Sequence, residues 1–281
     1  MSALPAGSAA AHNMNAPIAV FDSGVGGLTV VGALRRALPG ESVVYLGDTA
    51  RVPYGGKSRK TIERYSEEIA LLLVAEGAKM VVVACNTASA LALDHLRRIL
   101  PVPVEGVIEP GVQAALAATR TGHVAVIGTK ATIGSGAYER GLRAARPDIR
   151  VMAIACPLLV PLIEEGMFDD EVTDAVLRRY LSPLLGTDVD AIVLGCTHYP
   201  LLAPAIKRAL GPDIVLVDSA ANCATVVASH LSTQGMLAPG GEGSLALGFT
   251  DPPDRFLEVA GRALGLATAP TALRVVPPLG R

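Results

Sequence analysis

The stretch VVVACNT, residues 81–87, and the stretch AIVLGCTH, residues 191–198, decide how this chain folds. Each is a short apolar run that ends in a cysteine followed by small polar residues. Unbroken apolar runs are typical of strands buried in a parallel sheet, where ligands bind at the carboxyl ends of the strands. The sequence therefore predicts two parallel sheets, each presenting one thiol, Cys85 or Cys196, at that edge.

A second pair of runs extends the similarity between the two halves. IAVFDSG at 18–24 and VAVIGTK at 124–130 are both short apolar strands that end at a hydroxyl residue. Each lies at a similar distance before its cysteine run. We interpret the two pairs as a divergent internal duplication of an α/β unit. A chain of 281 residues with 51% hydrophobic content can bury two cores of ordinary size.

Helical patterns follow both cysteines. Residues 87–98 show helical periodicity with a hydroxyl at the start, and residues 201–210 continue as a helix after Pro200 and end at Gly211. Each thiol is therefore expected just before a helix N-terminus. The partial positive charge and free N–H groups there favour the thiolate and attract carboxylates.

A glycine-rich turn follows the first strand. DSGVGG at 22–27 is expected to open a helix that runs to about Leu38. Nucleotide-binding motifs do not fit: residues 24–27 lack the final glycine of GxGxxG, and GGKS at 55–58 would need glycine where Arg51 stands. Residues 48–55, after the strand at 43–46, are expected to form a ligand-facing loop, although a plain turn would have a similar sequence.

Composition limits the kind of partner. The net charge is −2 and no basic cluster occurs, so a small molecule is a better ligand than nucleic acid. No apolar stretch is long enough to span a membrane, and the N-terminus lacks the pattern of a signal peptide. We expect a soluble, cytoplasmic protein without a membrane partner.

The other reactive residues carry no comparable signal. The four cysteines are too far apart for the paired spacing of a structural zinc site, and no metal is predicted. Cys156 and Cys223 are expected to be buried hydrophobic side chains. Lys57 and Lys130 could suggest a Schiff base with pyridoxal phosphate, but nothing in the sequence marks either lysine as activated.

Two thiols facing one pocket suit the inversion of an amino-acid stereocentre. That reaction needs a base on one face of the α-carbon and an acid on the other. Because enantiomers have equal free energy, both directions must work, and one acid/base group in each half meets that need. Charge developing on the substrate carboxylate would be met by helix N-termini and by polar side chains. The candidates for this contact are Ser23, Asn86, Thr87 and Thr197.

Two other functions remain open at this point. A cysteine hydrolase would use Cys196 with His198, but it leaves Cys85 unexplained. A carboxylate-binding protein without catalysis would use both thiols only to line its pocket. The hydrolase predicts a covalent thioester, and the binding protein predicts ligand binding that survives replacement of both cysteines.

Five motifs, in order along the chain, resemble those of one known family. They are FDSGVGGLTV at 21–30, YLGDTARVPYG at 45–55, ACNTASA at 84–90, VIGTKATI at 126–133 and LGCTHYPLL at 194–202. The chain resembles the bacterial glutamate racemases of the cofactor-independent aspartate/glutamate racemase superfamily from about Ile18 to Phe256. This resemblance implies an α/β fold of two pseudo-symmetric three-layer α/β domains with largely parallel sheets and an active site in the cleft between them.

The resemblance also implies roles for particular residues. Cys85 is expected to act on D-glutamate with help from Asp22. Cys196 is expected to act on L-glutamate with help from His198, which Glu164 supports. The implied substrate contacts are Asp22, Ser23, Pro53, Tyr54, Gly55, Asn86, Thr87, Thr129, Thr132, Thr197 and His198.

Some of these assignments have simpler alternatives. Asp22 could cap its helix, and His198 could be a hydrogen-bonded structural residue. Glu164 is followed by Glu165, so the sequence does not fix which carboxylate is used. The same stretch has Leu159 where the family pattern leads us to expect phenylalanine.

The resemblance also predicts the domain boundaries and the cellular role of the protein. A disordered extension is expected over 1–15, a first domain over 16–107 plus 217–266, a second domain over 108–216 and a loose tail over 267–281. The family implies an isomerase with no cofactor, glutamate as its small-molecule substrate and a homodimer. It also implies a supply of D-glutamate for peptidoglycan synthesis, and so a role in cell wall biogenesis and cell shape.

Overall fold

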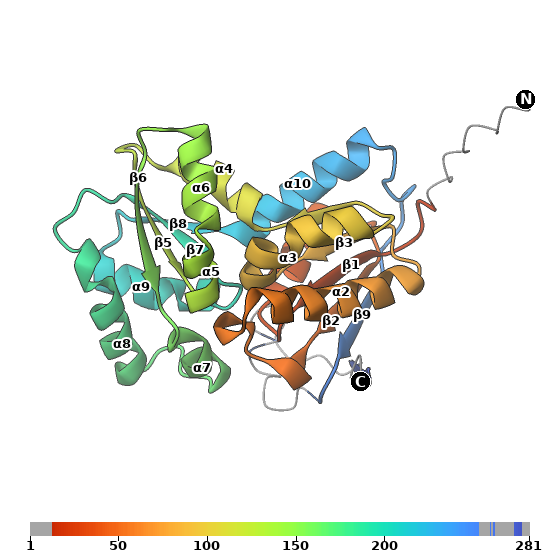
Figure 1. Cartoon of the computed structure of the whole chain (residues 1–281), viewed down its shortest axis with the longest axis horizontal. Coiled ribbons are helices and arrows are strands. Elements are labelled where there is room, and N and C mark those ends of the chain that lie inside the picture. Colours follow the sequence, from red (N-terminus) through yellow and green to blue (C-terminus); the bar gives the residue numbers. More distant parts are fainter. Residues whose placement is uncertain (1–12, 253–258, 260, 262–272, 277–281) are drawn as a thin grey trace, which may run out of the picture.

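The computed structural model of the chain describes residues 13–252, 259, 261 and 273–276. Figure 1 shows two sheets, one in each half of the molecule, with helices packed against them. All the strand pairs in both sheets are parallel. The predicted α/β class with two parallel sheets is therefore confirmed.

The first sheet has six strands in the order β10-β9-β2-β1-β3-β4. Its strands are β1 (Ile18–Asp22), β2 (Val43–Gly47), β3 (Met80–Val83), β4 (Val104–Gly106), β9 (Leu245–Phe249) and β10 (Leu273–Val275). Every residue of β1 and β3 is buried, as expected for unbroken apolar runs at the centre of a parallel sheet. Strand β9 lies beside β2, so the chain returns to its first sheet after it has built the second.

The second sheet has four strands in the order β6-β5-β7-β8. Its strands are β5 (His123–Gly128), β6 (Arg150–Ala155), β7 (Ala191–Gly195) and β8 (Val215–Asp218). The first sheet contains the same arrangement as β2-β1-β3-β4. In both sheets, the strand that ends at a cysteine lies beside the strand that opens the unit. The common strand order supports the predicted duplication.

Ten α-helices occur in the described part of the chain. They are α1 (Leu28–Ala37), α2 (Arg59–Ala75), α3 (Asn86–Ile99), α4 (Ile108–Ala118), α5 (Lys130–Ser135), α6 (Ala137–Ala145), α7 (Leu159–Glu164), α8 (Glu171–Leu181), α9 (Ala203–Leu210) and α10 (Ser219–Thr233). Side chains at four N-termini accept a backbone N–H and so stabilise the first turn. These capping residues are Ser58, Thr129, Asp170 and Asp218.

The helices predicted after the cysteines are present. Helix α3 begins immediately after Cys85, and α9 follows a short 3-10 turn after Cys196. The helix predicted after the glycine-rich turn is also present, as α1, which begins at Leu28 and ends at Ala37. Before it, the buried Asp22 carboxylate accepts hydrogen bonds from the N–H groups of Gly24 and Gly27 and holds the intervening residues as a turn.

The expected loose tail is wrong for one segment. Residues 273–275 form β10, which pairs with β9 and so satisfies its backbone groups within the sheet. The rest of the tail lies outside the described residues, as do residues 1–12 of the N-terminal extension. Within the extension, Met14 is held in place because its carbonyl oxygen accepts a hydrogen bond from Lys79.

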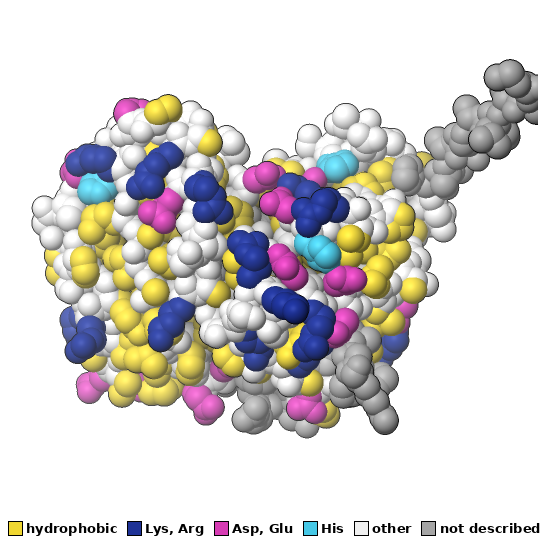
Figure 2. Space-filling view, in the orientation of Figure 1, with side chains coloured by type: hydrophobic (Ala, Val, Ile, Leu, Met, Phe, Trp, Pro, Cys, Tyr) yellow, Lys and Arg dark blue, Asp and Glu magenta, His cyan; other side chains and the backbone are white. Residues whose placement is uncertain are grey.

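Charges of both signs are mixed on the face of the molecule that Figure 2 shows. On the face shown in Figure 2, lysine and arginine side chains are interspersed with aspartate and glutamate. Within the described residues, no helix combines the length and the apolar character needed to cross a membrane.

A buried ion pair ties together four segments near the N-terminal end of the first sheet. Lys79 Nζ lies 2.6 Å from Glu41 Oε2, and the two side chains are 1% and 2% exposed. The ammonium group also donates to the carbonyl oxygens of Met14 and Met236. The other Glu41 oxygen accepts from the N–H of Ala238. These contacts compensate much of the cost of burying both charges.

We expect Lys79→Met to lower the free energy of unfolding by about 3 to 5 kcal/mol, because Glu41 would remain buried without its counter-charge. Equilibrium unfolding in urea measures the change. Lys60→Met, at an exposed position on α2, serves as the matched control and should stay close to the parent. A cost as small as that of the control would mean that the buried pair contributes little to stability.

Candidate active site

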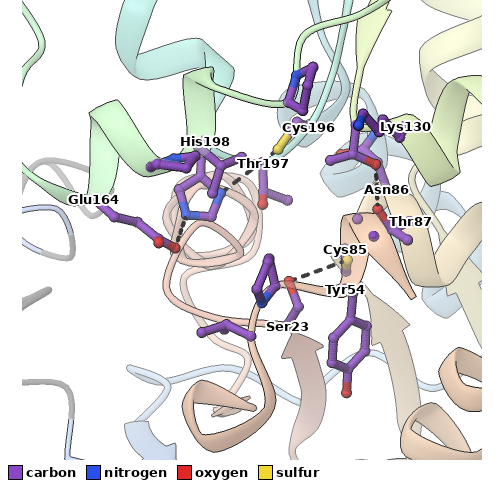
Figure 3. A pocket seen from close by; sticks show the side chains of 18 residues that line it. Ser23, Tyr54, Cys85, Asn86, Thr87, Lys130, Glu164, Cys196, Thr197 and His198 are labelled. Atoms are coloured by element: carbon purple, nitrogen blue, oxygen red, sulfur yellow. Dashed lines mark hydrogen bonds and ion pairs between the residues drawn. The ribbon is translucent and has the colours of Figure 1, made fainter.

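One large cleft lies where the carboxyl ends of the two sheets meet. It contains about 1040 Å³ of empty space, including its opening to solvent. Eighteen residues from both units line it, as shown in Figure 3. They are Ser23, Val52, Pro53, Tyr54, Gly55, Gly56, Cys85, Asn86, Thr87, Thr129, Lys130, Pro157, Val160, Pro161, Glu164, Cys196, Thr197 and His198.

Cys85 brings a neutral thiol to the pocket from the first unit. It follows β3 directly and is the N-cap residue of α3, and its thiol donates a hydrogen bond to Ser23 Oγ at 3.7 Å. Burial is the main cause that raises the pKa of this thiol to about 12, and the nearby charge of Asp22 adds to the increase. The N–H of Ala88 in the first turn of α3 acts in the opposite direction. The expected preference for thiolate at this helix terminus is therefore wrong for Cys85, because the effect of burial on its pKa outweighs that of the helix.

Cys196 brings the second thiol from the other unit, directly after β7, in the position equivalent to that of Cys85. Its Sγ lies 3.8 Å from Nδ1 of His198. On the other side of the imidazole ring, Nε2 lies 3.2 Å from Glu164 Oε1, with the geometry of an ion pair rather than a directed hydrogen bond. Figure 3 shows the three side chains in one row, with Cys85 on another wall of the pocket.

The environment of His198 favours the imidazolium form. Burial is the largest single influence and opposes the charge. The interactions with Cys196 and Glu164 outweigh burial and raise the pKa of His198 to about 10. The ring therefore carries a proton at neutral pH, directly beside the Cys196 thiol.

Three hydroxyl groups connect the two units at the pocket. Thr87 Oγ1 lies 3.0 Å from Thr129 Oγ1 and 3.1 Å from Thr132 Oγ1, and the two latter atoms are 3.0 Å apart. Thr87 lies on α3, whereas Thr129 and Thr132 belong to the start of α5. Each hydroxyl can either donate or accept, so the group can rearrange around a carboxylate.

The loop before α2 forms another wall of the cleft. The buried hydroxyl of Tyr54 donates to Asp48 Oδ2 at 2.5 Å, and Thr250 donates to the other oxygen of Asp48 at 2.8 Å. The tyrosine ring therefore points away from the opening, as Figure 3 shows. Gly55 lies so close to Thr129 that an added Cβ would stand 2.7 Å from the threonine Cβ. This contact brings the loop against the second unit.

Asp22 and Thr132 are the two predicted site residues that do not line the cleft. Asp22 is fully buried beneath it. One carboxylate oxygen accepts from Gly24 and Gly27 at 3.1 and 3.0 Å, and the other accepts from Thr197 Oγ1 at 3.4 Å. Asp22 thus holds the glycine turn and reaches the second unit. Thr132 lies one layer behind Thr87 and Thr129.

The other twelve predicted residues line the cleft, but six lining residues were not predicted. These are Val52, Gly56, Lys130, Pro157, Val160 and Pro161. Val160 and Glu164 are four residues apart on α7 and so share one face of that helix. This spacing was the available signal for Val160. Within the described residues, no three His, Cys, Asp or Glu side chains form a group suited to a metal ion.

Comparisons with known proteins agree with this geometry. Residues 27–227 match the model of the Asp/Glu/Hydantoin racemase family. The glutamate racemase of Geobacter metallireducens is 51% identical over 249 residues, which cover 88% of this chain and 92% of that protein. The crystal structure of glutamate racemase RacE1 from Bacillus anthracis superposes with a TM-score of 0.89 at 38% identity, covering 94% of this chain and 98% of that one. Glutamate racemase from Francisella tularensis, solved in complex with D-glutamate, gives a TM-score of 0.87 at 37% identity with the same coverage.

Proposed function

The chain belongs to the Asp/Glu/Hydantoin racemase family, and on that basis we propose that it interconverts L-glutamate and D-glutamate by a cofactor-independent two-thiol mechanism. One observation carries the proposal most strongly. Two equivalent strands, one in each sheet, end at buried cysteines that line the same cleft. Relatives of 44–52% identity are glutamate racemases, which supports glutamate as the substrate.

In the L-to-D direction, Cys196 as thiolate takes the α-proton, and the electron pair of the broken C–H bond is delocalised into the substrate carboxylate. The Cys85 thiol then gives its proton to the opposite face of the α-carbon. Cys196 ends as thiol and Cys85 as thiolate, so the reverse reaction begins from that state. The two cysteines thus exchange the roles of acid and base.

The raised pKa of the Cys85 thiol suits it to the role of acid in this direction. For the D-to-L direction it must become a thiolate, and its high pKa makes this unfavourable without a nearby positive charge. The ammonium group of glutamate supplies such a charge when the substrate binds. We propose that substrate binding and activation of Cys85 are coupled in this way.

His198 and Glu164 support Cys196 in the same scheme. The imidazolium next to Sγ stabilises a thiolate, and the Glu164 carboxylate keeps the ring protonated. Asp22 assists Cys85 from beneath the cleft through the turn that carries Ser23, whose hydroxyl accepts from the Cys85 thiol. The hydroxyls of Thr87 and Thr129, which contact Thr132 behind them, bind the substrate carboxylates together with the polar groups of the other predicted contacts that line the cleft.

Replacing Glu164 by glutamine should move the alkaline limb of the pH–rate profile to lower pH by about one unit. The pKa of His198 is raised to about 10, so its positive charge persists below that pH and is lost above it. A neutral amide removes one cause of the increase, and the charge is then lost at lower pH. The measurement is kcat/KM for both enantiomers across this range. The neighbouring exposed Glu165→Gln is the matched control, and an equal shift in both variants would assign the role to neither carboxylate.

The test of the proposed function is incubation of the purified protein with L-glutamate, and separately with L-aspartate, in D2O without added cofactor or metal. Loss of optical rotation together with deuterium at the α-carbon for glutamate alone is the expected result. Loss for aspartate instead would change the substrate. No exchange with either amino acid would sink the racemase proposal, and a covalent thioester in mass spectra would favour the cysteine hydrolase.

We further propose that the protein is a cytoplasmic homodimer that supplies D-glutamate for peptidoglycan synthesis. The family resemblance is the basis for the role and for the division of the chain. Strand β8 (Val215–Asp218) belongs to the second sheet, so the proposed boundary at 216/217 falls within this strand. The first domain comprises 16–107 and 217–266, and the second comprises 108–216. Size-exclusion chromatography with light scattering measures the assembly directly.

A further inference from the structure

A buried tyrosine outside the cleft connects the two halves of the site. Tyr138, on α6, is 3% exposed, and its hydroxyl accepts a hydrogen bond from Asn86 Nδ2 at 2.8 Å. The same hydroxyl lies 3.1 Å from Ser219 Oγ at the start of α10. One phenol oxygen thus joins α3 of the first unit, α6 of the second unit and the helix through which the chain returns to the first.

The ring of Tyr138 packs against the other thiol-bearing strand. An added Cβ on Gly195 would stand 3.3 Å from the Cε2 atom of Tyr138. Gly195 is the last residue of β7 and directly precedes Cys196. On the other side, an added Cβ on Gly111 would stand 3.0 Å from Cε1. The absence of side chains at both glycines lets the ring lie flush between α4 and β7.

These contacts place Tyr138 against a sequence neighbour of each cysteine. Its hydroxyl holds the residue that follows Cys85, and its ring touches the residue that precedes Cys196. We propose that Tyr138 is a positioning residue for racemisation, which sets the separation and direction of the two thiols across the substrate. The assignment rests on the proposed two-thiol function.

The chemistry of the phenol fits this role. Burial raises its pKa, so the hydroxyl stays protonated and donates to Ser219 while it accepts from Asn86. With its nitrogen bound to Tyr138, the Asn86 side chain is fixed in orientation beside Cys85. Asn86 lines the cleft, whereas Tyr138 does not, so the tyrosine acts only through its neighbours.

The test is Tyr138→Phe, which keeps the ring and removes only the hydroxyl. We expect kcat to fall about tenfold with KM changed by less than about twofold, because the substrate still binds but the thiols are misplaced. The equilibrium constant between enantiomers is one, so kcat/KM must fall by the same factor in both directions. Thr173→Val is the control: it removes a buried hydroxyl that donates to the carbonyl of Met167, away from the cleft.

A double-mutant cycle separates positioning from general stability. In an Asn86→Ala background, adding Tyr138→Phe should change kcat by less than about twofold, because the hydroxyl acts through Asn86. A full tenfold effect in that background, or a rise in KM alone, would overturn the assignment. So would a loss of kcat in Thr173→Val equal to that in Tyr138→Phe. If the parent protein is active and Tyr138→Phe has the same kcat, the positioning role of Tyr138 is wrong and the proposed function is unaffected. If the parent protein is inactive, both the proposed function and the positioning role are wrong.

Discussion

Serine in place of either Cys85 or Cys196 is expected to lower kcat/KM for the inversion of glutamate by about 10³-fold or more. General acid–base catalysis by one positioned group contributes factors of this size, and a hydroxyl is too weak an acid to replace a thiol in either role. The measurement is circular dichroism of each enantiomer during turnover. Cys223→Ser is the matched control, because this buried cysteine donates to the carbonyl of Gly106 and lies outside the cleft.

Hydrogen exchange distinguishes the two cysteines. With Cys196→Ser, the remaining Cys85 should still exchange the α-proton of D-glutamate with D2O, without inversion. With Cys85→Ser, only L-glutamate should exchange. Near-normal inversion in either variant would exclude the two-thiol mechanism, and exchange of both enantiomers by one variant would show that a single base reaches both faces.

The second large effect is expected at Gly26, where the glycine turn of the first unit meets the second. A Cβ at this position would stand 2.5 Å from both Thr197 Oγ1 and His198 Nδ1, and 2.7 Å from His198 Cε1. Such contacts require the segment after Cys196 to move. We expect Gly26→Ala to lower kcat/KM by about 100-fold, the effect of displacing catalytic groups by about an ångström.

Gly134→Ala is the control for this substitution. Gly134 lies on α5, and a Cβ there would meet no atom within 4 Å. It should keep the activity of the parent, and far-ultraviolet circular dichroism should show both variants folded. Full activity in Gly26→Ala would mean that the two units separate freely at this point and that their close packing is unnecessary for catalysis.

The apolar runs were sufficient to predict the central strands. Strands β3 and β7 are buried throughout. A short apolar run that ends at polar residues is compatible with few structures other than a buried strand. The return of the chain to the first sheet came from the family resemblance. It depends on β9 pairing with β2, about 200 residues earlier in the chain, and neither strand carries a local signal of its partner.

The site was predictable where residues follow strand ends directly, and less so elsewhere. The protonation of Cys85 depends on how deeply its thiol is buried, which local sequence does not reveal. The sequence did not indicate a role for Tyr138 for a similar reason. It lies on a short amphipathic helix, where a tyrosine is expected to be an ordinary core residue. Its hydrogen-bond partners Asn86 and Ser219 are distant in sequence.

The high pKa of Cys85 has a consequence for the chemical durability of the protein. Oxidants and alkylating electrophiles attack thiolates far faster than thiols. In the proposed mechanism Cys85 keeps its proton until glutamate binds, and the protonated thiol reacts slowly with peroxide and with other electrophiles. On this mechanism, we expect oxidation at Cys85 to be faster during turnover than in the free protein.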